Sequence, residues 1–285
     1  MHRALASLAD GLVVRTLRIR GIRRRFIAHA EGRIHALEVP GRGPLPPVLI
    51  LHGLGSCAAD EARLIRALVP RCRAVLALDL PGHGLSTPPP DGRVASGALA
   101  LAEALGQLTS EPVVIVGNSL GCLAAIRVTL ARPELVAGLF LLAPGGAPMD
   151  QDELERTTAI FRRATHGDVL AFIDRMQLRA PGLRHVAAVV IRGRAARPGL
   201  RLAVQQARTD DLLTPGELHA LAVPVEVLWG EHERLLPAHG RAFFEAHLPA
   251  GSVRVARGLG HVPQHQDLRF TVAEACAFLE RVAAA

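Results

Sequence analysis

Short apolar runs alternate with longer amphipathic segments from about residue 48 to the end of the chain. The short runs share flanking Gly, Pro or charged residues, and they lie at residues 48–51, 74–78, 113–116, 139–142, 225–228 and 253–256. The longer segments repeat apolar positions at helical spacing, and they lie at residues 94–108, 119–131, 238–247 and 267–283. Strands that are apolar throughout are buried on both faces of a sheet. The pattern therefore predicts an α/β protein, in which parallel core strands alternate with crossover helices that cover both faces.

Two parts of the chain depart from this alternation. Residues 22–30 and 33–39 alternate polar and apolar positions around a short turn, which predicts an antiparallel hairpin at the sheet edge. Residues 147–213 are helix-like throughout, with Gly and Pro punctuation and no strand pattern. We expect this segment to form a helical cap, or lid, inserted after the sixth strand of an eight-stranded, mostly parallel sheet. Residues 1–146 and 214–285 then form the core domain.

Ser119 lies between Gly117 and Gly121 in the sequence GNSLG, where the apolar run 113–116 passes into a helical segment. Small residues also gather in ordinary tight turns, so these five residues alone do not distinguish a nucleophile from a turn residue. The strand before and the helix after favour a nucleophile, because G-x-S-x-G in that context forms a nucleophile elbow. The two glycines avoid clashes in so sharp a turn, which leaves the serine hydroxyl exposed at its apex.

A serine nucleophile needs a general base and a carboxylate, and in this chain order both should follow it. His261 lies in a Gly-rich loop after the last apolar run and is the candidate base. His265 is the rival, but its position at the approach to a helix indicates a side chain that faces solvent. Glu231 and Glu233 follow the run 225–228, and either carboxylate fits the role of orienting the base.

Attack on a carbonyl also requires two hydrogen-bond donors for the developing oxyanion. The backbone N–H of Leu120 directly follows the nucleophile and lies at the positive end of its helix. The second candidate donor is the backbone N–H of Leu54, in the sequence HGLG after the first core strand. We expect His52 of the same motif to hydrogen-bond to the backbone rather than to react.

Five motifs follow one another in a characteristic order: HGLG at 52–55, DLPGHGLS at 79–86, GNSLG at 117–121, WGEHERLLP at 229–237 and GLGHVP at 258–263. On these motifs the chain resembles the α/β-hydrolase superfamily over nearly its whole length. The resemblance implies the α/β-hydrolase fold and a Ser–His–acid triad. In capped members the acid stands three residues after the glycine and four before a proline, which selects Glu233, where most relatives have Asp. It also implies that Asp79, His83 and Ser86 are structural.

The charge and the aromatic content of the chain argue against nucleic acid as its partner. The formal net charge is +7 and all 33 basic residues are arginine, but they are scattered and aromatic residues make up only 3%. The chain therefore lacks the clustered basic and aromatic residues of a nucleic-acid-binding protein.

No apolar run reaches the length of a membrane span, and no cleavage site follows the basic start, so we expect a soluble cytoplasmic protein. We expect no metal, no cofactor and reduced thiols, because metal-ligand spacing is absent among Cys57, Cys72, Cys122 and Cys276.

Three functions follow from these residues. The first is a carboxylesterase-like serine hydrolase that cleaves an ester or related acyl bond of a small, apolar molecule through an acyl-enzyme. The second is a hydrolase of carbon–carbon bonds in ring-fission products, which Asn118 and the arginine-rich cap favour. Those enzymes usually have Met after the serine, where this chain has Leu120. The third is a non-catalytic protein that binds a ligand in the same cleft.

The cap segment, residues 147–213, offers side chains for a pocket but no transferable code for its ligand. Its arginines fit a carboxylate substrate or a solvated outer face, and we expect the outer face for Arg162, Arg163, Arg175, Arg184, Arg192 and Arg194. Its large apolar side chains are expected in the pocket or in the packing of the cap segment, namely Met149, Phe161, Phe172 and Met176.

Overall fold

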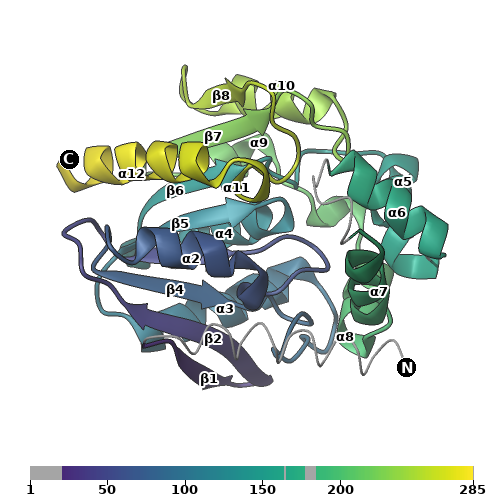
Figure 1. Cartoon of the computed structure of the whole chain (residues 1–285), viewed down its shortest axis with the longest axis horizontal. Coiled ribbons are helices and arrows are strands. Elements are labelled where there is room, and N and C mark those ends of the chain that lie inside the picture. Colours follow the sequence, from purple (N-terminus) through teal and green to yellow (C-terminus); the bar gives the residue numbers. More distant parts are fainter. Residues whose placement is uncertain (1–20, 164, 177–183, 285) are drawn as a thin grey trace.

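The computed structural model describes residues 21–163, 165–176 and 184–284. These residues form one sheet of eight strands in the order β1-β2-β4-β3-β5-β6-β7-β8 (Figure 1). The strands span Arg23–His29 (β1), Gly32–Pro40 (β2), Val48–Leu51 (β3), Ala74–Leu78 (β4), Val113–Asn118 (β5), Val136–Leu142 (β6), Val225–Gly230 (β7) and Val253–Ala256 (β8). The predicted eight-stranded, mostly parallel sheet is confirmed.

Strand direction determines where the loops of the sheet meet. β1 pairs antiparallel with β2, and β2 pairs antiparallel with β4, so the predicted hairpin forms one edge of the sheet. The pairs β4–β3, β3–β5, β5–β6, β6–β7 and β7–β8 are all parallel. Because parallel strands have their carboxyl ends on the same side of the sheet, the loops after β3, β5, β7 and β8 gather on that side.

Helices cover both faces of the sheet, as predicted. In β3, Leu49 packs into a hydrophobic core with α3 and α4, whereas its neighbour Ile50 points into a second core with α2 and α12. Figure 1 shows α2 and α12 on the near face. The helices that flank the sheet span Ala62–Leu68 (α2), Val94–Leu108 (α3), Leu120–Ala131 (α4), Pro215–His219 (α9), His239–His247 (α10), Pro263–Gln266 (α11) and Leu268–Ala284 (α12), with 3-10 turns at Ala58–Glu61 (η1) and Pro133–Leu135 (η2).

The expectation that every apolar run is buried on both faces is wrong for β8. This strand is the outer edge of the sheet, and Arg254 and Val255 are exposed. The Arg254 guanidinium pairs with Glu226 of β7 and with Glu274 of α12, which holds the charged side chain along the edge. An edge strand has a neighbour on one side only, so its apolar residues are not enclosed.

In the described part of the cap segment, between β6 and β7, there are four helices. They span Gln151–Arg163 (α5), His166–Arg175 (α6), Arg184–Ala195 (α7) and Pro198–Gln206 (α8), followed by a 3-10 turn at Thr209–Asp211 (η3). α6 packs against α7, and α5 packs against α8. Figure 1 shows all four gathered beside one end of the sheet. Among the described residues, no helix is long and apolar enough to cross a membrane.

Candidate active site

Ser119 occupies a strained turn between β5 and α4. Its φ of 53° and ψ of −117° lie in a region that non-glycine residues rarely adopt. The turn brings backbones together so closely that a Cβ atom on Gly121 would stand 2.2 Å from the carbonyl oxygen of Leu51. The Ser119 N–H donates to the Leu142 carbonyl at 3.1 Å, which ties the turn to the end of β6. Ser119 lines a cavity, and the backbone contacts around the turn maintain its strained conformation.

His261 and Glu233 come together from the loops after β8 and β7. The Nδ1 atom of His261 lies 2.6 Å from Oε2 of Glu233, and both side chains are less than a tenth exposed. The other carboxylate oxygen of Glu233, Oε1, accepts from the N–H groups of Leu235 at 2.6 Å and Leu236 at 3.1 Å. The Glu233 carboxylate is therefore fixed in orientation, with one oxygen held by the backbone and one facing the imidazole.

Electrostatics favour an ionised carboxylate at Glu233. Burial raises the pKa of the Glu233 carboxyl, but the charge and hydrogen bond of His261 and the two backbone N–H groups outweigh burial and lower this pKa below 4.5. Glu231, the other candidate acid, is about half exposed and accepts from the Gly258 N–H at 2.7 Å. Of the two glutamates, Glu233 is the one that the structure places on His261.

The segment after β3 forms a tight turn that includes Leu54. The Ser56 N–H donates to the Gly53 carbonyl at 3.2 Å, and Gly55 between them has a φ of +77°. This combination is typical of a type II turn, with Leu54 at its second position. His52 hydrogen-bonds through Nδ1 to the Gly53 carbonyl at 2.8 Å and accepts the Leu80 N–H on Nε2 at 3.0 Å. Its predicted role as a backbone partner is confirmed.

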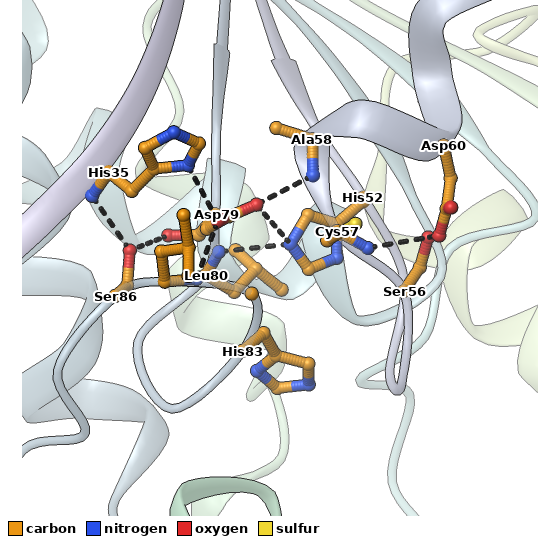
Figure 2. Close-up of polar contacts among 12 residues, drawn as sticks. His35, His52, Ser56, Cys57, Ala58, Asp60, Asp79, Leu80, His83 and Ser86 are labelled. Atoms are coloured by element: carbon orange, nitrogen blue, oxygen red, sulfur yellow. Dashed lines mark hydrogen bonds and ion pairs between the residues drawn. The ribbon is translucent and has the colours of Figure 1, made fainter. Parts of the chain in front are cut away.

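The Asp79 carboxylate links the loop after β4 to β2 and to the first residue of η1 (Figure 2). Its carboxylate accepts from the Ala58 N–H at 2.7 Å and the Leu85 N–H at 2.8 Å, and it pairs with Nδ1 of His35 at 2.7 Å. Burial raises the pKa of Asp79, but the hydrogen bond and charges of the histidines outweigh it, and the pKa lies below 3.8. Ser86 Oγ donates to the Asp79 carbonyl at 2.8 Å. These contacts agree with the expected structural role.

His83, in the same segment, takes no part in a second triad. Its ring is buried, and burial together with the nearby His52 lowers the pKa of His83 to about 3, so it is neutral at ordinary pH. Nδ1 of His83 lies 3.1 Å from the Pro81 carbonyl. The ring therefore packs as a neutral group against the ring of His52.

A cavity of about 1110 Å³ lies between the loops at the carboxyl ends of the strands and the cap segment. Ser119 and His261 line it, together with Leu54. Apolar side chains from the cap segment also line it, including Ile160, Phe161, Phe172, Met176 and Ile191. Within the described residues, no group of three His, Cys, Asp or Glu side chains is placed to hold a metal ion.

Two expectations about cavity residues are wrong. His265 lines the cavity rather than facing solvent, because the buried Glu61 draws Nε2 of its ring to within 3.5 Å of Oε1. Arg194 is 7% exposed, so it does not belong to a solvated outer face, whereas Arg175 is exposed as expected, although it also lines the cavity. Arg175 donates to the Arg234 carbonyl at 2.6 and 3.0 Å.

Asp60 is a cavity residue that the sequence reasoning missed. It lies in η1, six residues after Leu54, outside all five motifs, and lines the cavity beside Arg194. No periodicity or motif links these two residues, since 134 positions separate them.

Comparison with known proteins places this geometry in a family. A 29% identical relative is the pimeloyl-[acyl-carrier protein] methyl ester esterase of Aeromonas hydrophila, matched over 80% of this chain and 93% of that protein. The 2-hydroxy-6-oxononadienedioate/2-hydroxy-6-oxononatrienedioate hydrolase of Klebsiella pneumoniae is 27% identical over 85% of this chain and 91% of that one. The crystal structure of a membrane phospholipase A, a bacterial virulence factor, superposes with a TM-score of 0.81 at 26% identity, over 99% of this chain and 93% of that one. Residues 48–274 match the model of the alpha/beta hydrolase family, and the chain belongs to that family.

Proposed function

We propose that the chain is a serine hydrolase that cleaves an ester of a small molecule through a triad of Ser119, His261 and Glu233. The observation that carries the proposal is the 2.6 Å hydrogen bond between Glu233 and His261, beside a cavity that the strained Ser119 also lines. A serine that shares a cavity with a histidine base, itself oriented by a buried carboxylate, is the arrangement that can activate the serine hydroxyl.

The proposed reaction begins with attack of Ser119 Oγ on the substrate carbonyl carbon. His261 accepts the serine proton on Nε2, because its Nδ1–H is engaged by Glu233. The N–H groups of Leu54 and Leu120 stabilise the oxyanion of the tetrahedral intermediate. The carbon–oxygen bond to the alcohol breaks as His261 returns the proton to the leaving oxygen. An acyl-enzyme remains on Ser119, and water, deprotonated by His261, releases the acid.

The cavity supports an apolar acyl group as the substrate. Its wall on the cap side consists largely of aliphatic and aromatic side chains, with Phe161 and Phe172 in edge-to-face contact at 5.7 Å between ring centres. Enclosing the ester beneath the cap segment excludes water and strengthens the interactions with the oxyanion. In this proposal residues 147–213 act as the lid, and residues 1–146 and 214–285 act as the catalytic core.

A second candidate activity is hydrolysis of a carbon–carbon bond. The likeness to the Klebsiella pneumoniae hydrolase supports it, since that match covers 85% of this chain. The test is a panel that contains p-nitrophenyl esters of increasing chain length and one 2-hydroxy-6-ketodienoate. A kcat/KM for the dienoate above that for every ester would replace the first proposal with the second.

Substitution of Ser119 by Ala tests the proposed nucleophile. Removing such a serine is expected to lower kcat on p-nitrophenyl butyrate by about 10⁶. The matched control is Ser96→Ala, since Ser96 bonds to Asp91 at the start of α3 and lies outside the cavity lining. Unchanged turnover in Ser119→Ala, or failure of a fluorophosphonate probe to label the folded protein, would favour a binding protein instead.

A further inference from the structure

The turn that holds the Leu54 amide packs against the cap segment as well as the core. The Leu54 side chain joins a hydrophobic cluster of cap residues that includes Phe161 of α5 and Leu200 of α8. Gly55 lies flat against Phe161, since a Cβ atom on Gly55 would stand 2.3 Å from Cε1 of that ring. The cap segment therefore packs directly against one side of the turn at residues 53–56.

An ion pair makes a second contact between the cap segment and the chain just after this turn. Arg194, near the end of α7, donates from Nη1 and Nη2 to the two carboxylate oxygens of Asp60, at 2.5 and 2.9 Å. Nη2 also lies 3.3 Å from Sγ of Cys57. A bidentate arginine–carboxylate pair fixes orientation as well as distance, because both groups are planar. Both residues line the cavity that Ser119 lines.

Asp60 connects this ion pair to the turn. Its Oδ2 atom accepts from Oγ of Ser56 at 2.6 Å and from the Cys57 N–H at 3.2 Å (Figure 2). Ser56 in turn closes the turn through its N–H bond to the Gly53 carbonyl. Burial raises the pKa of Asp60, but Arg194 and the Ser56 hydroxyl outweigh burial and lower the pKa to about 2. A continuous chain of contacts thus runs from Arg194 to the turn at residues 53–56.

We propose that Arg194 is a positioning residue, which acts through Asp60 to hold the 53–56 turn where the Leu54 N–H meets the oxyanion. The inference rests on the proposed serine-hydrolase function. Through Arg194, the cap segment then helps to position the oxyanion donor Leu54, in addition to covering the acyl group as a lid. Interactions that strengthen only in the transition state affect kcat rather than ground-state binding. Loss of Arg194 should therefore lower kcat and leave KM nearly unchanged.

The test compares Arg194→Met, Asp60→Asn and the double variant on one p-nitrophenyl ester. A trifluoromethyl ketone with the same acyl group serves as the inhibitor, because its serine adduct carries an oxyanion. We expect kcat to fall about 10- to 100-fold in Arg194→Met, since a small misplacement of a catalytic group has effects of this size. Affinity for the ketone should fall by the same factor as kcat/KM. The double variant should lose no more than the worse single variant, because both residues act through one contact.

The matched control is Arg201→Met, which removes the same charge from an exposed position on α8 and should keep wild-type kcat. Wild-type kcat and ketone affinity in folded Arg194→Met and Asp60→Asn, or a loss confined to KM, would overturn the inference. If Arg194→Met does not fold, the nearly isosteric Asp60→Asn decides by the same criteria. Ester turnover that does not depend on Ser119 would instead overturn the proposed function, and the inference with it.

Discussion

Replacing Glu233 by Gln should disable the proposed general base while the fold stays intact. In the wild type, Oε1 of Glu233 accepts two backbone N–H groups and Oε2 faces Nδ1 of His261. A glutamine keeps its carbonyl oxygen toward the two backbone donors, so its NH₂ group must face the imidazole. Two donors cannot share that contact, and Nδ1 of His261 must then become the acceptor. The proton moves to Nε2, the atom that has to accept the proton of Ser119.

The size of the loss follows from this change of tautomer. A carboxylate-to-amide substitution that leaves a catalytic histidine in the wrong tautomer lowers kcat by about 10⁴, or about 5 kcal/mol of transition-state stabilisation. The 2.6 Å contact is a buried, charge-assisted hydrogen bond, which places this site in the same range. KM should change little, because the carboxylate lies behind the imidazole.

The assay is steady-state hydrolysis of a p-nitrophenyl ester, with thermal unfolding as the check of the fold. Glu231→Gln is the matched control, since Glu231 is about half exposed and bonds to the Gly258 N–H rather than to His261. We expect its kcat to stay within about threefold of the wild type, in the range of a surface change. Equal, small losses in Glu233→Gln and Glu231→Gln would show that Glu233 does not orient His261.

Other predictions concern stability. Asp60 has a pKa of about 2 instead of 3.8, so its ionisation stabilises the fold above about pH 4 and this contribution, about 2 kcal/mol, disappears as the pH falls through 2. The unfolding free energy of Asp60→Asn should therefore vary less between pH 5 and 2 in urea titrations, and an unchanged slope would contradict this. Gly121→Ala should lower the unfolding free energy by about 1–3 kcal/mol or more, because its Cβ would meet the Leu51 carbonyl. Gly106→Ala, in α3, should raise the unfolding free energy by about 0.5–1 kcal/mol, because the added Cβ atom would stand no closer than 3.6 Å to its nearest neighbour. Equal effects of Gly121→Ala and Gly106→Ala on the unfolding free energy would contradict this difference in packing.

Much of the sheet could be predicted because burial on both faces leaves a local signature in the sequence. β3 and β4 begin and end where their apolar runs do, and α3 spans the predicted residues 94–108. β8 has a similar run, but its place at the sheet edge depends on the topology, which a four-residue pattern does not contain. The seven-residue helix α2 was not predicted, because it is too short for a helical period to stand out.

The residues of the candidate site also fall into two groups, those that a local motif predicts and those that only the fold reveals. Ser119, His261 and Glu233 belong to motifs that each carry their own local signal, so the sequence was enough to nominate them. Arg194 and Asp60 carry no such signal, and an arginine on an amphipathic helix was expected to face solvent. Only the fold shows that α7 turns this arginine toward the cavity, where the partly buried carboxylate of Asp60 balances its charge.

In the proposed reaction, the acyl group of the substrate is transferred to Ser119. The most direct measurement mixes the enzyme with p-nitrophenyl butyrate, quenches the reaction with acid within the first turnover and maps the adduct by peptide mass spectrometry. We expect a burst of p-nitrophenol and a butyryl group on the peptide that contains Ser119, with neither in Ser119→Ala. A butyryl group on another residue, or full turnover by Ser119→Ala, would contradict it.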